Sequence, residues 1–167
     1  MIRYGCLLVG LLLVSAITTI GQEEALTNPK LDLAVGTSFM HFGTASSVNL
    51  MGAGFSGQYR LSNRLGFVGQ FNASYGGGTS ARTLLFGPEI SLRRHYSPFA
   101  HILIGGAHLS QGSSNSGSFA TEIGGGVDRN VEGKISWRLA EFDYIPTYFH
   151  QGRQDNFRLS TGLIFRF

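Results

Sequence analysis

The sequence has 167 residues, of which 43% are hydrophobic, 14% charged and 12% aromatic, and its formal net charge is +3. This length predicts one domain at most. The charged fraction is well below the roughly 25% of soluble domains, so we expect apolar side chains to face a membrane or a large apolar ligand. The single cysteine excludes a disulfide framework and a cysteine-based zinc site, and the dilute positive charge argues against nucleic-acid binding.

The first segment predicts export. One early cation precedes an apolar run, Cys6–Ile17, which small and polar residues follow. This order is typical of a secretory signal peptide, and the run is shorter than the roughly 20 residues of a membrane helix. We predict a signal peptide over residues 1–21, with cleavage before Gln22 and cleavage after Ala16 as the weaker alternative. A barrel domain is predicted over residues 22–167.

Eight later segments alternate between apolar and polar residues with the period of a β-strand. In chain order they are Leu31–Phe42, Val48–Tyr59, Leu65–Tyr75, Thr83–Arg93, Phe99–Leu109, Phe119–Asp128, Lys134–Tyr144 and Phe157–Phe167. The third has the clearest contrast, with Phe67 and Phe71 on one face and Gln70 and Asn72 on the other. The fifth is apolar on both faces, so its orientation stays open. Most have the length that a strand tilted by about 45° needs to cross a bilayer.

The connectors alternate in length. Three are short and three are longer and rich in Gly, Ser, Asn or Gln: residues 61–64, 94–97 and 129–133 against 76–82, 110–118 and 145–156. Short turns on one side and long loops on the other are typical of outer-membrane barrels, whose short turns are periplasmic. An even strand number also places both ends of the mature chain on the periplasmic side.

A soluble lipocalin-like barrel alternates too, so the choice between the two depends on the composition of each face. The aromatic face carries almost no charge, and its aromatic residues gather near strand ends, as interface girdles do. These residues are Tyr59, Tyr75, Phe99, Trp137, Tyr144, Phe165 and Phe167. We therefore predict an all-β fold, an eight-stranded antiparallel up-and-down transmembrane β-barrel. Its own side chains fill a lumen of this size, so we expect no open channel.

Charged residues on the opposite face predict a polar network in the lumen: Glu89, Arg93, Glu122, Arg138, Glu141, Asp143 and Arg158. Mutual pairing is the favoured explanation over transport, because an unpaired buried charge is costly. Arg138 has the opposite parity from Glu141, so either a bulge brings both into the lumen or Arg138 lies near the periplasmic rim. Pro88 within a strand predicts a bulge with Gly87. The glycines at 124–126 fit strand bending better than a phosphate loop, because no helix follows them.

The run Phe157–Phe167 resembles the terminal signal strand of bacterial outer-membrane barrels, which ends in Phe with apolar residues at every second position. With residues 85–88, 98–101 and 124–128, the chain resembles the small outer-membrane beta-barrel domain family of OmpA-type and OmpX-type barrels. The resemblance implies insertion by the barrel assembly machinery, which reads the apolar positions of the last strand: Phe157, Leu159, Leu163, Phe165 and Phe167. It implies no reaction and no cofactor.

One constellation could be catalytic. His108, Ser110 and Glu122 are similar in type and spacing to the residues of outer-membrane lipid A deacylases, which need a base, a nucleophile and an orienting carboxylate. Gln111 follows the serine where that family usually has Asn. Strand parity also points Glu122 into the lumen, so we predict no catalytic site. His41, His95 and His150 have no metal-ligand spacing, and we predict no metal site.

These observations predict a monomeric protein of the cell outer membrane that acts in envelope integrity or surface interaction. The predicted partners are the bilayer, the assembly machinery and an unidentified surface ligand at loops 110–118 and 145–156. The alternatives are a lipid-active enzyme and a soluble lipocalin-like carrier.

Overall fold

A computed structural model describes residues 30–42, 48–112, 114–149 and 152–167. The predicted signal peptide, residues 1–21, lies outside the described residues. Within the described part of the chain, no helix is long and apolar enough to span a membrane.

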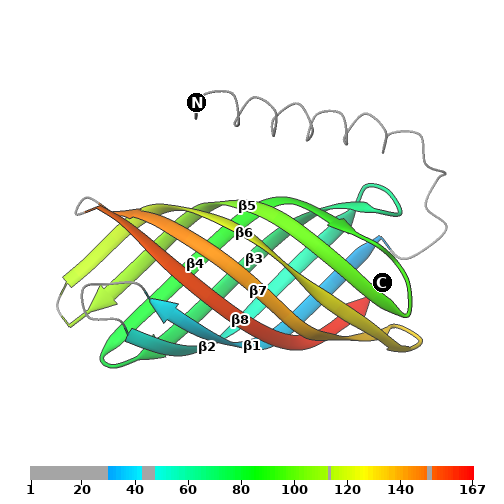
Figure 1. Cartoon of the computed structure of the whole chain (residues 1–167), viewed down its shortest axis with the longest axis horizontal. Helices are drawn as coiled ribbons and strands as arrows, with labels where there is room; N and C mark the ends of the chain where they lie inside the picture. The colour runs from blue at the N-terminus through cyan, green and yellow to red at the C-terminus, as the bar shows by residue number, and fades with distance from the viewer. Residues whose placement is uncertain (1–29, 43–47, 113, 150–151) are drawn as a thin grey trace, which may run out of the picture.

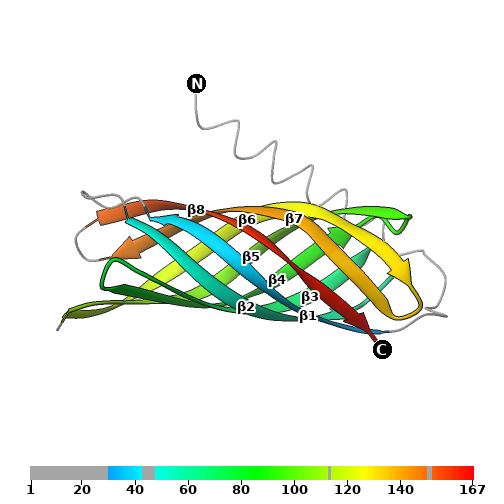
Figure 2. The ribbon, with the colours of Figure 1, turned by 90° about the horizontal axis from the view of Figure 1, so that it is seen from below.

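The described residues form eight antiparallel strands that close into a barrel, each paired with its neighbours in sequence (Figures 1 and 2). The strands are β1 (Leu31–Phe42), β2 (Val48–Arg60), β3 (Leu65–Gly76), β4 (Thr79–Ser91), β5 (Tyr96–Gln111), β6 (Ser114–Glu132), β7 (Ile135–Phe149) and β8 (Gly152–Arg166). The predicted fold class is confirmed. In Figure 1 the C-terminus lies at the same end as the β2–β3, β4–β5 and β6–β7 connections, which we name the near end; the opposite end is the far end.

The two faces of the wall differ as the alternation predicts. On β3, Phe71 is 44% exposed on the outside, whereas its neighbour Asn72 is 6% exposed inside. Large apolar side chains cover the outside of every strand, which is the arrangement of a barrel in lipid. A lipocalin-like barrel would have the opposite orientation.

The hairpins at the far end are longer than predicted. Residues predicted as the loops 76–82, 110–118 and 145–156 are almost entirely strand. The β3–β4 turn is formed by Gly77 and Gly78 alone, and both have positive φ, which glycine tolerates without strain. A Ser- and Gly-rich composition was a poor guide here, because backbone hydrogen bonds hold a hairpin together whether or not its side chains alternate.

Two further predictions were wrong. No bulge occurs at Pro88, because Phe86 pairs with Ile104 and Glu89 with His101 in one continuous register. Proline lacks an N–H donor, so the ladder loses a bond to β5 without gaining a residue. Phe99 does not belong to the aromatic girdle, because it is buried in the lumen.

An apolar cluster is buried in the far half of the lumen. Met40, Leu50, Ala81 and Ile145 form one buried cluster, against which Val48 and Leu109 pack. A second buried cluster consists of Val68, Leu85, Leu103, Ala107 and Ala120. It runs alongside the charged middle of the lumen, since Leu103 pairs with Glu122 in the ladder. Polar and charged side chains fill the rest of the described lumen, including Thr147 and Asn156 beside the first cluster.

Candidate functional site

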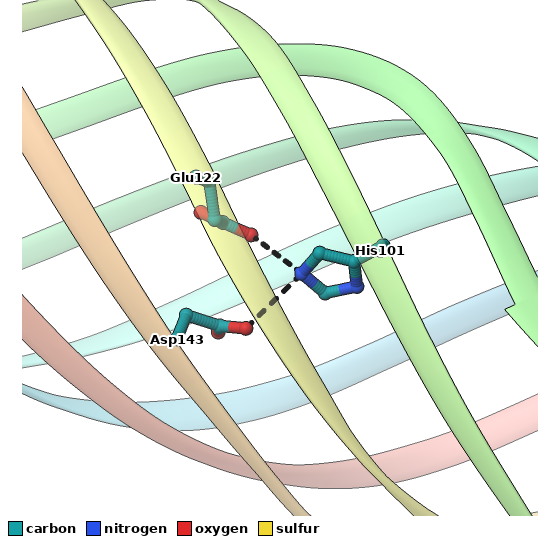
Figure 3. A group of neighbouring side chains, drawn as sticks. All are labelled: His101, Glu122 and Asp143. Atoms are coloured by element: carbon teal, nitrogen blue, oxygen red, sulfur yellow. Dashed lines mark ion pairs between the residues drawn. The ribbon is translucent and has the colours of Figure 1, made fainter. Parts of the chain in front are cut away.

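Three buried side chains from adjacent strands meet at the middle of the lumen: His101 of β5, Glu122 of β6 and Asp143 of β7 (Figure 3). The Nε2 atom of His101 lies 3.2 Å from Glu122 Oε1 and 3.1 Å from Asp143 Oδ1. Strand register explains the meeting, because Gly124 of β6 pairs with His101 on one side and with Asp143 on the other. Without a side chain, Gly124 leaves room for both neighbours to approach.

Arg158 of β8 completes this row of side chains. Its guanidinium donates hydrogen bonds of 2.8 Å to Glu122 Oε1 and of 2.8 and 3.0 Å to Asp143 Oδ2. When the Gln70 amide is oriented by its partners, it donates to Glu122 Oε1 at 3.0 Å and accepts from Arg158 at 2.7 Å. Charge-assisted bonds of this kind hold both carboxylates in fixed orientations.

A bulge in β7 adds Arg138 to the network. The register shifts against both neighbouring strands between Arg138 and Glu141, so both side chains face the lumen. This is the first of the two predicted alternatives. Arg138 donates at 2.9 Å to Asp128 and at 3.2 Å to Glu141, and its guanidinium lies 4.1 Å from the centre of the Phe99 ring.

The other side of the imidazole also faces acids. His101 Nδ1 lies 3.9 Å from Glu89 Oε2 and 3.8 Å from Glu141 Oε1. Both carboxylates have partners of their own, since Gln58 donates to Glu89 and Ser160 donates to Glu141, each at 2.8 Å. Four carboxylates therefore surround one imidazole among the described residues.

A second charged group lies nearer the near end and has the opposite balance. Asp32 of β1 is hydrogen-bonded to Arg60, and it lies 3.7 Å from Arg93 and 3.8 Å from Arg166. Of the residues described at this level, three guanidinium groups thus surround one carboxylate. The lumen is divided into an acidic middle and a basic near end.

No protein family model matches the chain, and no curated protein matches it in sequence. Several solved structures share its architecture. Neisserial surface protein A matches with a TM-score of 0.70 and 15% identity, over 85% of this chain and 100% of its own. Ail, the attachment invasion locus protein of Yersinia pestis, matches with a TM-score of 0.54 and 13% identity over 83% and 100%. The N-terminal β-barrel domain of Pseudomonas aeruginosa OprF matches with a TM-score of 0.51 and 11% identity over 83% and 100%.

The chain has the fold of the small outer-membrane barrels. The likeness is one of fold, and it agrees with the OmpA-type and OmpX-type resemblance in the sequence.

Within this barrel, the seven residues predicted for the lumen lie at two levels. Arg93 reaches the basic group at the near end, and the others lie in the acidic middle: Glu89, Glu122, Arg138, Glu141, Asp143 and Arg158. The predicted lumen network did not include His101, Asp32, Arg60 or Arg166. His101 was missed because β5 is apolar on both faces.

The residues considered as a catalytic set are not brought together. His108 is exposed on the outside of β5, and Ser110 has the same parity, whereas Glu122 is fully buried in the lumen. The barrel wall therefore separates the carboxylate from the other two side chains.

The apolar positions of the last strand all face outward from the barrel: Phe157, Leu159, Leu163, Phe165 and Phe167. The backbone of Phe167 exchanges hydrogen bonds of 2.8 and 3.1 Å with Leu31. The last strand thus pairs with the first along the full length of the first, from Asp32 and Arg166 to Phe42 and Asn156.

Proposed function

We propose that the chain is a small integral protein of the outer membrane, with a structural or surface-interaction role and a lumen that does not conduct. The buried lumen carries this proposal. Arg158, Glu122 and Asp143 fill its middle at 1% exposure or less, and Leu50 and Ile145 fill the far half at 0%. Two small cavities, one beside Arg138 and Glu141 and one beside Asp32 and Glu89, measure about 30 and 20 Å³. Each is large enough for one or two water molecules and too small for a hydrated pathway.

The composition of the far end supports the proposal that this end of the barrel faces the outside of the cell. Its hairpins are long and polar, and residues 114–117 of β6 are exposed. Longer extracellular segments and short periplasmic turns are the asymmetry of outer-membrane barrels. We propose that a surface ligand binds at residues 110–118 and 145–156, whose described residues lie almost entirely in the paired strands of two hairpins. Rigid strands lose less conformational entropy on binding than loops do.

We also propose that residues 1–21 are a signal peptide and that the assembly machinery recognises β8. The outward apolar positions of β8 support this proposal, as does the closing contact between Phe167 and Leu31. Deleting Phe167 should sharply lower the outer-membrane level of the protein. Deleting residues 114–117 should lower it much less, because exposed hairpin tips tolerate change. Equal membrane levels of the two variants would contradict the assignment.

The proposed function is tested by fractionation followed by conductance measurements. The full chain, expressed in a Gram-negative host, should be found in the outer membrane and should migrate differently on a gel before and after heating. Purified protein in a planar bilayer should give no stepwise ion conductance. Recovery in the soluble periplasm would contradict the membrane location, and stepwise conductance would contradict the closed lumen.

We propose no enzymatic role. The wall between Glu122 and the pair His108 and Ser110 supports this view, because a triad needs mutual hydrogen-bond contact of about 2.6 to 3.2 Å. Mass spectrometry of lipid A after incubation with the purified barrel should detect no acyl release. Release that disappears in the Ser110→Ala variant would establish an enzyme.

A further inference from the structure

The group His101, Glu122 and Asp143 has the geometry of a metal site. Zn²⁺ binds imidazole nitrogen and carboxylate oxygen at about 2.0 to 2.2 Å, so two ligands of a tetrahedral ion lie about 3.3 Å apart. The Nε2 atom of His101 lies 3.2 Å from Glu122 Oε1 and 3.1 Å from Asp143 Oδ1 (Figure 3). One ion beside these atoms could contact all three residues.

Two buried atoms of the group, His101 Nε2 and Asp143 Oδ1, face each other at 3.1 Å, and neither has a directed hydrogen bond among the described residues. Glu122 turns Oε1 toward His101 and Arg158, and its second oxygen, Oε2, has no hydrogen-bond partner among the described residues either. All three side chains are at least 99% buried. Buried polar atoms are normally satisfied, so these atoms point to a ligand that accepts electron pairs.

The local charge also favours a divalent ion. Five carboxylates lie in the acidic middle among the described residues, against the two guanidinium groups of Arg138 and Arg158. A proton on His101 would supply one positive charge and leave two carboxylates uncompensated. A divalent ion supplies two charges in a region where uncompensated charge is most costly.

The surrounding residues match the outer shell of a metal site. Histidine ligands usually direct the second ring nitrogen at a carboxylate, which fixes the tautomer and the orientation of the ring. His101 Nδ1 faces Glu89 and Glu141. Arg158 holds Asp143 through Oδ2 and leaves Oδ1 directed at the histidine.

Gly124 preserves space at this point. A Cβ there would overlap Asp143 Oδ1 and would lie 2.8 Å from His101 Nε2. Gly124 lies between His101 and Asp143 in the ladder, and any side chain at this position would prevent the two from approaching each other.

We propose that His101, Glu122 and Asp143 bind one divalent transition-metal ion of the zinc class in the lumen. An imidazole ligand favours Zn²⁺ or a related ion over Mg²⁺ and Ca²⁺, which prefer oxygen ligands throughout. Three protein ligands leave the fourth position of the ion for water. The site requires only the folded barrel, so it stands independently of the surface role proposed above.

The test measures zinc bound by the folded full chain in detergent. Protein stripped with a chelator is refolded with Zn²⁺ present, because the site is enclosed, and free metal is then removed before elemental analysis. Wild-type protein should retain about one equivalent. His108→Gln is the matched control, since His108 lies on the outside of the same strand, and it should retain the same amount.

His101→Gln and Asp143→Asn should bind zinc at least about 100-fold more weakly, since even outer-shell changes cost 10- to 100-fold. Heat-modifiable gel mobility checks that each variant folds, and Asp143→Asn keeps the shape of the side chain if His101→Gln does not fold. Co²⁺ in place of Zn²⁺ should give the visible absorption of a tetrahedral site in wild-type protein and not in the folded variant. Absence of retained zinc in wild-type protein, or equal retention by wild-type protein and a folded site variant, would overturn the proposal.

Discussion

The middle and the far half of the lumen are both buried, yet different forces fill them. In the middle, Arg158 is hydrogen-bonded to Glu122 and Asp143, so each charge depends on its partners. In the far half, the side chains of Leu50 and Ile145 belong to an apolar cluster that packs by shape and volume. Loss of one partner in the middle leaves a buried charge uncompensated, whereas loss of volume in the far half leaves a cavity. The comparison shows how one barrel interior can depend on pairing at one level and on packing at the next.

The largest effect is expected from Arg158→Leu. This change leaves Glu122 and Asp143 without their guanidinium partner, and breaking a buried ion pair costs about 3 to 5 kcal/mol. The free energy of unfolding can be measured by urea titration in lipid vesicles with the fluorescence of Trp137. Arg153→Leu is the control, because its pair with Asp155 is exposed and should contribute at most about 1 kcal/mol. Equal losses of unfolding free energy in the two variants would show that ion pairs in the lumen contribute no more to stability than exposed ones.

Leu50→Ala tests the packed half. Leu50 is fully buried, and its truncation should cost about 2 to 5 kcal/mol through lost burial and a residual cavity. Met51→Ala, the neighbour on the outside of β2, should cost much less because Met51 is 73% exposed. The same urea titration compares the two variants, and similar values would mean that the far half of the lumen is loosely packed.

The comparison extends through the wall to the outer face, where large apolar side chains surround Phe71. Phe71→Arg near the middle of β3 should cost about 2 to 4 kcal/mol in bilayers, because a cation at the membrane midplane is poorly solvated. Asn72→Ser, on the lumen side of the same strand, should be mild. Unfolding measured in vesicles should separate the two variants. A Phe71→Arg variant as stable as wild type would contradict the assignment of this face to lipid.

The smallest expected effect comes from glycine. Gly124→Ala places a methyl group against Asp143 and His101, and overpacking of this kind costs about 1 to 3 kcal/mol. Gly117→Ala is the control, since a Cβ at that position meets nothing within 4 Å. If the two substitutions had the same effect on the free energy of unfolding, the space at Gly124 would not matter to the charged middle.

The fold could be predicted from the sequence because one face of each strand lies against lipid. Phe67 and Phe71 contrast with Gln70 and Asn72, and this contrast identifies both the strand and its orientation. The signal failed in β5, where Leu103 faces the lumen and Ile104 faces outward, because both environments accept an aliphatic side chain.

His101 was not predicted to face the lumen because the orientation of β5 was left open. The register between β5 and β6 determines that orientation. Gln111 pairs with Ser114, so odd-numbered residues of β5 share a face with even-numbered residues of β6. Since Glu122 faces the lumen, His101 must face it too. The serines of residues 110–118 give this segment the composition of a loop, whereas residues 110–111 and 114–118 continue the ladder.

The pairing of β1 with β8 has a consequence for folding. The ladder between them runs from Asp32 and Arg166 to Phe42 and Asn156, and it joins the two ends of the barrel sequence. Until this last seam forms, two strands expose unpaired backbone groups to hydrocarbon, where each such group is costly. Partially assembled sets of strands are therefore unstable in the bilayer. We expect the barrel to form and to unfold as a single cooperative unit, with closure of this seam as its final committed step.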